Sequence, residues 1–251
     1  MRITFLGTGT SVGVPAVGCE CETCLSDDPR DNRLRTSVLV THLGRNILID
    51  ASTDFRQQAL RIGLKRLDAI LFTHSHADHC FGLDDTRPIM FREGAMACFA
   101  TETTWRGLRR IYAYAFEQAP YPGVPRIIPH SIDGEFNLLG LDVEPLTVIH
   151  GRLEVTAFRI NDFAYVTDCN LIPEDTCARL KGLDLLVIDA LRFKSHPTHM
   201  TLDQAVGYIE RLRPRRALLT HISHDIKHDE TSQHLPEGVE IAYDGLIVEI
   251  G

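Results

Sequence analysis

The stretch Thr73-His74-Ser75-His76-Ala77-Asp78-His79 places three imidazoles and one carboxylate within seven residues. It follows the apolar run 68–72, which is typical of a buried strand, so the cluster lies where the strand ends and a loop begins. His74 and His76, two apart in an extended segment, can point to the same side, and a helix could begin near the aspartate. Imidazole and carboxylate suit zinc, manganese or iron, so this segment can serve two adjacent cations. The alternative, a solvated polar loop, leaves so many metal-ligand residue types unexplained.

The composition is that of a globular protein without a broad membrane or nucleic-acid surface. Its 251 residues can bury a large core, and 44% of them are hydrophobic and 24% charged. The net charge of −8 argues against nucleic acid and anionic membranes as partners. A small anionic substrate is compatible with it, because two divalent cations would make a metal site locally positive.

The first residues enter strand-like sequence at 3–6, and we find neither the apolar segment nor the cleavage site of a signal peptide. No stretch approaches the roughly 18 apolar residues of a membrane span. We therefore expect a cytoplasmic protein without a membrane partner. In that compartment an odd count of seven cysteines does not predict a disulfide framework.

The chain shows no internal repeat, low-complexity tract or linker, so we expect one domain covering residues 1–251. Helices are expected at 55–62, at 102–115 and after the capping box 201–204. The proline-rich segment 119–129 is expected to be a surface loop or lid. Strands in two groups, each followed by helices, indicate two packed sheets with helices outside. The expected strands are 3–6, 36–41, 46–50, 68–72, 97–100, 135–138, 141–149, 153–160, 163–167, 184–189, 216–220, 239–242 and 246–250.

Three further residues could complete the metal site. His150, Asp168 and His221 each come at the end of an apolar strand-like run. A rigid scaffold presents ligands at one edge in this way. Each residue alone is an ordinary polar group at a strand end, but as a set they supply the ligands that the central stretch lacks.

This pattern closely resembles the metallo-β-lactamase superfamily. The resemblance implies an α+β fold, an αββα sandwich of two mixed sheets with helices on the outer faces and a dinuclear site along one edge. It also implies the ligand sets. His74, His76 and His150 would hold one metal, Asp78, His79 and His221 the other, and Asp168 would bridge them.

A second metal site is indicated by Cys19, Cys21 and Cys24, three soft thiolates whose spacing lets them converge on one zinc. The fourth ligand must come from elsewhere, and His224 is our choice, with His228 behind it. Such a zinc would connect the long N-terminal loop to the C-terminal part and be structural. A cluster of buried free thiols is the alternative.

Several residues could contact a substrate. His199, in a loop before the capped helix, could serve as a general acid near neutral pH, with His196 beside it. Arg87 could grip a phosphate, although an ion pair with Asp84 or Asp85 would explain it equally well. In the glycine-rich segment 7–15 the amides and hydroxyls of Thr10 and Ser11 could face an anion, or form a plain turn.

The segment 7–15, the cysteine motif, the histidine cluster and His199 together resemble the PhnP group, phosphodiesterases that open 5-phosphoribosyl 1,2-cyclic phosphate. The resemblance implies a structural zinc and a proton donor at His199, and we take His199 and Asp78 as the catalytic residues. We expect hydrolysis of this or a related nucleotide or sugar diester, with two Mn²⁺ or Zn²⁺ ions in the active site and one structural Zn²⁺. Segment 95–140 and His130 carry no motif that assigns them a role.

Other functions would use the same metal residues. A ribonuclease Z-like nuclease shares the early Leu6-Gly7-Thr8-Gly9, but the acidic balance offers no basic stripe for RNA. A non-hydrolytic relative of the pyrroloquinoline-quinone biosynthesis protein B and an ester hydrolase resembling lactonases are further alternatives. The sequence leaves open whether two copies form a homodimer.

Overall fold

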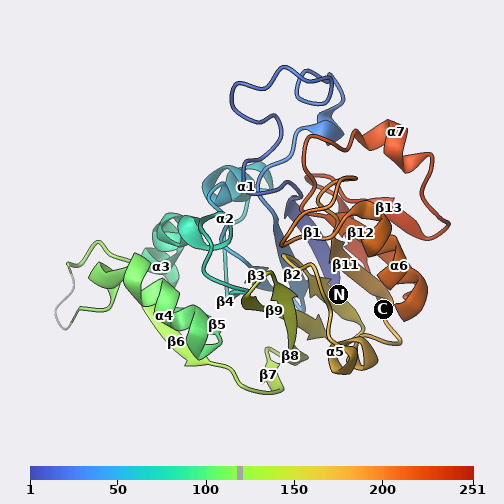
Figure 1. Cartoon of the computed structure of the whole chain (residues 1–251). Helices are drawn as coiled ribbons and strands as arrows, with labels where there is room; N and C mark the ends of the chain where they lie inside the picture. Colours follow the sequence, from blue (N-terminus) through green and yellow to red (C-terminus); the bar gives the residue numbers. More distant parts are fainter. Residues whose placement is uncertain (118–120) are drawn as a thin grey trace.

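The computed structural model describes residues 1–117 and 121–251. Within these residues it contains two sheets of seven strands each, packed face to face. Helices cover the outer faces, one group on each side of the sandwich (Figure 1). The expected α+β fold of two mixed sheets with helices outside is confirmed.

The first sheet begins with an antiparallel part and ends with a parallel one. Its order is β14-β1-β2-β3-β4-β5-β6. Neighbours from β14 to β3 are antiparallel and those from β3 to β6 are parallel. The strands are β1 (Arg2–Gly7), β2 (Ser37–His42), β3 (Arg45–Ile49), β4 (Ala69–Leu71), β5 (Met96–Ala100), β6 (Ile127–Ser131) and β14 (Ile247–Glu249).

The second sheet repeats this plan, with the order β13-β12-β11-β10-β9-β8-β7. Neighbours from β7 to β10 are antiparallel and those from β10 to β13 are parallel. The strands are β7 (Phe136–Leu138), β8 (Leu141–His150), β9 (Leu153–Ile160), β10 (Phe163–Val166), β11 (Leu185–Asp189), β12 (Arg216–Thr220) and β13 (Val239–Ile241).

The central strands are apolar on both faces because both faces are covered. In β3, Ile47 and Ile49 pack between the sheets, whereas Leu48 packs under the helices. In β11, Leu185 likewise faces the other sheet and Leu186 faces the helices of its own side. Continuous apolar runs of this kind are typical of parallel strands buried on both sides.

Seven α-helices, counted over the described residues, cover the two sheets. The helix α6 begins at the predicted capping box, where the Thr201 hydroxyl accepts from the Gln204 amide at 3.2 Å and Gln204 accepts from the Thr201 amide at 2.9 Å. The helices beside the first sheet are α1 (Phe55–Arg61), α2 (Ala77–Cys80), α3 (Arg87–Glu93) and α4 (Glu102–Ile111). Those beside the second are α5 (Glu174–Arg179), α6 (Leu202–Leu212) and α7 (His228–Ser232).

Two expected elements differ from the structure. The helix expected at 102–115 ends at Ile111 and is followed by a short 3-10 turn at 113–115. In the expected loop 119–129, residues 119 and 120 lie outside the described residues, and 127–129 form part of β6. The proline in this strand is tolerated because β6 is the edge strand of its sheet, where one side needs no backbone donor.

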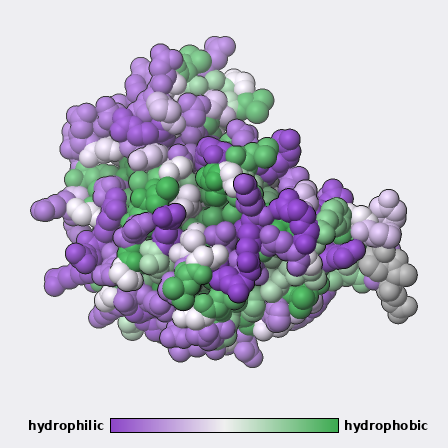
Figure 2. All heavy atoms as spheres, turned by 180° about the vertical axis from the view of Figure 1, so that it is seen from behind, coloured by the Kyte–Doolittle hydropathy of each residue, from purple (hydrophilic) through white to green (hydrophobic). Residues whose placement is uncertain are grey.

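The two chain ends lie side by side (Figure 1). The Met1 amine donates to the Ile250 carbonyl at 2.8 Å, and β1 pairs with β14. The surface in Figure 2 shows hydrophobic residues in several patches separated by hydrophilic ones. No helix within the described residues is long and apolar enough to span a membrane.

Candidate metal centre

The predicted metal ligands gather at one edge of the sandwich, where strands of both sheets end. The stretch 74–79 follows β4, His150 ends β8, Asp168 follows β10 and His221 follows β12. Asp168 and His221 have left-handed backbone, with φ of 54° and 60°. For residues other than glycine this conformation costs about 1–3 kcal/mol, and it persists where surrounding contacts enforce it.

The Asp168 carboxylate lies in the middle of the cluster. One oxygen is 3.2 Å from His79 Nε2 and 3.3 Å from His221 Nε2, and the other is 3.6 Å from His74 Nε2. Asp78 Oδ2 lies 3.4 Å from His79 Nε2. Two of the donor groups at the centre, in each of which the ligand atoms lie within 4.8 Å of one another, contain predicted metal ligands only, and Asp168 belongs to both. They are Asp78, His79, Asp168 and His221, and His74, His76 and Asp168.

The hydrogen bonding of these imidazoles fits bound cations. Among the described residues, Nε2 of His74, His79 and His221 is buried and has no hydrogen-bond partner. Buried nitrogens left unpaired are costly, and three of them around one carboxylate are suited to act as metal ligands. The buried His and Asp cluster therefore fits a dinuclear centre of divalent metals.

His150 completes the group around His74. Its Nδ1 donates to the Thr198 carbonyl at 2.8 Å, which leaves Nε2 for the centre. The His150 ring centroid is 5.2 Å from that of His76 and 5.9 Å from that of His74. The structure thus brings all seven predicted metal ligands together.

Asp50 is a functional residue that the sequence reasoning missed. Its Oδ2 accepts from His79 Nδ1 at 2.7 Å and from the Thr73 hydroxyl at 2.8 Å, and its Oδ1 accepts from the Thr73 amide at 2.8 Å. The Thr73 hydroxyl also accepts from His74 Nδ1, at 2.9 Å. One buried carboxylate therefore orients two ligands. The available signal was its place after the apolar strand 46–49, the same signal that singled out Asp168 and His221.

A second missed residue, Asp189, holds the predicted proton donor. Asp189 is the fully buried last residue of β11, and its Oδ2 accepts from His199 Nδ1 at 2.9 Å. The His199 ring stacks on His221, with centroids 4.7 Å apart and planes inclined by 13°. It also lies 4.5 Å from the His150 ring. His199 is thus placed beside both donor groups.

The pKa values show how the carboxylates act on the ligands. Burial lowers the pKa of His221, but Asp168, with help from Asp78, outweighs it and raises that pKa to about 9. Burial raises the pKa of Asp168, and His221 and His79 more than offset this and hold it well below its ordinary value. Burial, followed by His79, lowers the pKa of His74 well below its ordinary value. The centre thus favours a positive charge at His221, whereas the His74 imidazole stays neutral and can act as a ligand.

The predicted cysteine site also converges. The Sγ atoms of Cys19, Cys21 and Cys24 lie 3.1, 3.4 and 3.5 Å from Nδ1 of His224. A tetrahedral zinc bonded to three thiolates and an imidazole requires donor atoms about this close. His228 lies elsewhere, with its Nδ1 3.1 Å from Nη2 of the buried Arg33.

The expected substrate-contacting residues divide into two groups. Arg87 forms an ion pair with Asp84 at 2.7 Å, the alternative that the sequence allowed, and donates to the Gly123 carbonyl at 3.0 Å. The Thr10 amide donates to the Ile222 carbonyl at 3.0 Å, and the Ser11 carbonyl accepts from Arg35 at 3.0 Å. His196 lies beside the centre, 5.2 Å from the His199 ring. His130 stacks on Phe99, 4.5 Å away.

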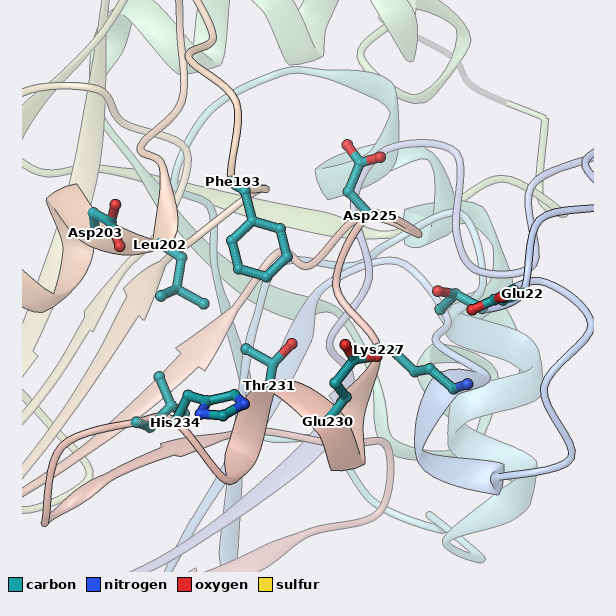
Figure 3. A pocket seen from close by; sticks show the side chains of 11 residues that line it. Glu22, Phe193, Leu202, Asp203, Asp225, Lys227, Glu230, Thr231 and His234 are labelled. Carbon is teal, nitrogen blue, oxygen red and sulfur yellow. The ribbon is translucent and has the colours of Figure 1, made fainter.

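A pocket of about 370 Å³ lies between the cysteine loop, the start of α6 and the region of α7 (Figure 3). The Phe193 ring points into its middle, with Leu202 and Thr231 nearby (Figure 3). Its lining includes the acidic residues Glu22, Asp203, Asp225 and Glu230. None of the lining residues belongs to the two donor groups, so this pocket is separate from the metal centre.

Comparison with known proteins identifies a family and several relatives that this chain resembles. A family model described as "Beta-lactamase superfamily domain" matches residues 45–222. A protein of Porphyromonas gingivalis named octanoyltransferase is 42% identical over 251 residues, which is 98% of this chain and 51% of that protein. The chain therefore spans about half the length of this curated relative.

Among solved structures, one described as a new diphosphatase from the PhnP family has a TM-score of 0.94 and 44% sequence identity, and the match covers 100% of this chain and 98% of that one. The Zn²⁺-bound PqqB from Methylobacterium extorquens has a TM-score of 0.78 at 22% identity, with 100% of both chains covered. The second likeness concerns the fold alone.

Proposed function

The chain belongs to the metallo-β-lactamase superfamily and is PhnP-like, and from this membership we propose that it is a metal-dependent hydrolase of small phosphodiesters. The observation that carries the proposal is the shared Asp168 carboxylate with His199 alongside. Six further predicted ligands surround it, and the buried Nε2 atoms of three of them have no hydrogen-bond partner among the described residues. This arrangement supports hydrolysis over the non-hydrolytic alternative.

The predicted ligands form two sets, each of which would hold one cation. His74, His76 and His150 would hold one, Asp78, His79 and His221 the other, and Asp168 would be shared. When bound, the cations would lower the pKa of a water and withdraw charge from the phosphoryl oxygens. The Asp50 carboxylate and the Thr198 carbonyl keep the histidine rings turned inward.

His199 is the proposed proton donor for the leaving group. Its Nδ1–H donates to Asp189, so the ring would act as an imidazolium whose second proton, on Nε2, is the one delivered to the leaving group. A sugar alkoxide is a basic leaving group that departs slowly without a proton, whereas nitrophenolate departs readily. General acid catalysis typically contributes about 10²–10⁴-fold.

For the substrate we propose 5-phosphoribosyl 1,2-cyclic phosphate or a related nucleotide or sugar diester. The PhnP-like sequence pattern supports the cyclic diester. The similar solved structure is described as a diphosphatase, so phosphoric diesters that contain a diphosphate belong in the same comparison. Both classes offer an anionic phosphoryl centre and an oxygen leaving group.

A second candidate is hydrolysis of an acyl ester at the same centre. The observation that favours it is the Porphyromonas gingivalis relative, which is named octanoyltransferase. The match covers about half of that protein, so its acyl transfer need not involve the half that resembles this chain. A comparison of octanoyl esters with phosphodiesters separates the two candidates.

The test uses protein stripped with a chelator and reloaded with manganese or zinc. We expect metal-dependent hydrolysis of bis(para-nitrophenyl) phosphate and little hydrolysis of the corresponding monoester. His199→Ala should slow a cyclic or alkyl diester by about 10²–10⁴-fold and the nitrophenyl diester much less. Turnover of octanoyl esters without turnover of any phosphodiester would replace the proposal with the second candidate.

A further inference from the structure

Asp189 stands at the junction of three parts of the metal centre. It pairs in register with Thr220, the residue before His221, on the neighbouring strand β12. The amide of Cys169, the residue after Asp168, donates to its Oδ2 at 3.1 Å, and His199 Nδ1 donates to the same oxygen at 2.9 Å.

The second oxygen of this carboxylate faces a metal ligand. Asp189 Oδ1 lies 3.7 Å from Nδ1 of His221, and neither atom has a hydrogen-bond partner among the described residues. A contraction of about 0.8 Å would bring the two atoms to an ordinary hydrogen-bond distance. The carboxylate therefore has one oxygen for His199 and the other for His221.

A carboxylate can only accept hydrogen bonds, so it selects imidazoles that carry a proton on Nδ1. For His221 this leaves Nε2 free to act as a metal ligand. For His199 it leaves Nε2 to carry the second proton of the imidazolium, the proton that a general acid delivers. Both rings then present Nε2 on the opposite side, and the near-parallel stacking of His199 on His221 keeps these directions aligned. His221 Nε2 indeed lies 3.3 Å from Asp168.

We propose that Asp189 is a positioning residue that sets the tautomer and orientation of both His199 and His221. It thereby fixes the position of the proton donor relative to the metal centre. The inference rests on the proposed function for its catalytic consequence. His199 belongs to a loop, whereas Asp189 belongs to a buried central strand. Through its hydrogen bond to Asp189, the loop residue His199 is fixed by a rigid strand, and catalytic geometry requires such fixed positions.

Asp189→Asn tests this role because it keeps the size of the side chain and removes its charge. The amide can donate to His199 Nδ1 and so favours the neutral ring with its proton on Nε2 alone. It no longer stabilises the imidazolium, which is the form that acts as the general acid. We expect a loss of about 10²–10⁴-fold on an alkyl or cyclic diester, as for His199→Ala, and less than about 10-fold on the nitrophenyl diester. The double variant should be no slower than His199→Ala alone, because residues that act as a unit are not additive.

Two further measurements do not depend on turnover. Zinc affinity in chelator competition should fall by about 10–100-fold through the loss of support for His221. In the zinc-loaded wild-type protein, ring-nitrogen NMR should place the proton of His199 on Nδ1, and His199→Ala assigns that signal. Asp184→Asn, at the residue just before β11 and with its side chain 38% exposed, is the matched control and should change neither readout.

Equal losses on both diesters, additive effects in the double variant, or a wild-type His199 protonated on Nε2 alone would overturn the inference. The NMR measurement needs only wild-type protein and His199→Ala, so a failure of Asp189→Asn to fold leaves it decisive. If the wild-type protein hydrolysed no phosphodiester, the proposed function would fail. The tautomer and affinity results would still decide what Asp189 does.

Discussion

Three residues of the metal centre, Asp50, Asp168 and His221, have left-handed backbone, with φ of 62°, 54° and 60°. Glycine would adopt this conformation without strain but carries no donor atom. The centre therefore accepts strain of about 1–3 kcal/mol per residue to place a carboxylate or imidazole directly after a strand. The surrounding core holds these turns, since all three side chains are buried.

Asp50→Asn isolates the support of the ligands from the ligands themselves. Asparagine tolerates the left-handed backbone, but its single carbonyl oxygen cannot accept from His79, the Thr73 hydroxyl and the Thr73 amide together. We expect metal binding weakened by about 10–100-fold, measured by competition with a chromophoric chelator. Asp85→Asn, at an exposed position, is the control. An unchanged affinity would show that Asp50 does not support the ligands.

At this scale the sequence could reveal the ligands but not their supports. The central stretch 74–79 has four donors in six residues, a density that local pattern detects. Asp50 contacts a ligand that is 29 positions away, and Asp189 contacts the proposed proton donor, which is 10 positions away across a loop. An acidic residue after a strand is common, and only the folded chain shows which of them faces a histidine.

Among the elements, α4 is packed directly on the metal-ligand loop. A Cβ atom at Gly107 would lie 2.2 Å from the hydroxyl oxygen of Ser75, which stands between His74 and His76. No side chain fits there unless the helix or the loop moves. In α6, by contrast, a Cβ at Gly207 would meet nothing within 4 Å.

These two helical glycines make a matched pair of substitutions. Gly107→Ala should destabilise the protein by about 1–3 kcal/mol, as overpacking does, and should weaken metal binding because the loop is displaced. Gly207→Ala should stabilise it by about 0.5–1 kcal/mol, because the unfolded chain loses freedom. Urea unfolding and metal titration of both variants check this. A Gly107→Ala protein with wild-type stability and affinity would contradict the close packing.

The elements themselves were largely predictable because hydrophobic period and capping are local. The α6 helix followed from its capping box, and the buried central strands followed from their apolar runs. The first part of the strand β6, residues 127–129, falls in the expected loop because the prolines of segment 119–129 mask it. Its identity comes from pairing with β5, a contact between residues 96–100 and 127–131 that no local pattern contains.

For the whole molecule, a buried arginine connects the N-terminal loop with the C-terminal segment. Arg33 Nη1 donates to the Ala242 carbonyl at 2.6 Å and to the Thr8 hydroxyl at 3.0 Å, and Nη2 contacts His228 Nδ1 at 3.1 Å. Since a guanidinium only donates, His228 must offer an unprotonated Nδ1. Burial, followed by Arg33 and Arg30, lowers the pKa of His228 to about 4.

This connection predicts a pH dependence of stability. The unfolded chain protonates His228 near pH 6.5, whereas the folded protein resists until about pH 4, so stability falls as pH drops between these values. Between pH 7.5 and 5 the loss should be about 2 kcal/mol, and His228→Asn should remove it. Urea unfolding of both proteins at the two pH values measures the difference. Parallel curves would exclude His228 as the source. The charged and titratable groups around it are Arg33, Arg30, Asp28, Asp31 and Tyr243.

The sandwich as a whole was predictable through the resemblance, but the order of its strands was not. The last strand, β14, pairs with the first, β1, and each sheet changes from antiparallel to parallel pairing midway. These pairings join residues up to about the full chain length apart. They depend on which faces are buried together, which an isolated stretch of sequence does not specify.

The adjacency of the two chain ends has a consequence for tethering. From Met1, β1 runs six residues toward Gly9, which bridges to Ile222, the neighbour of His221. At about 3.3 Å per residue the ends lie roughly 20 Å from the ligand edge. A second protein module attached to either end would hang from the far side of the sandwich and leave the mouth of the metal centre open. If that module were an enzyme, the length of the tether would then decide how readily the module's product reaches the metal centre.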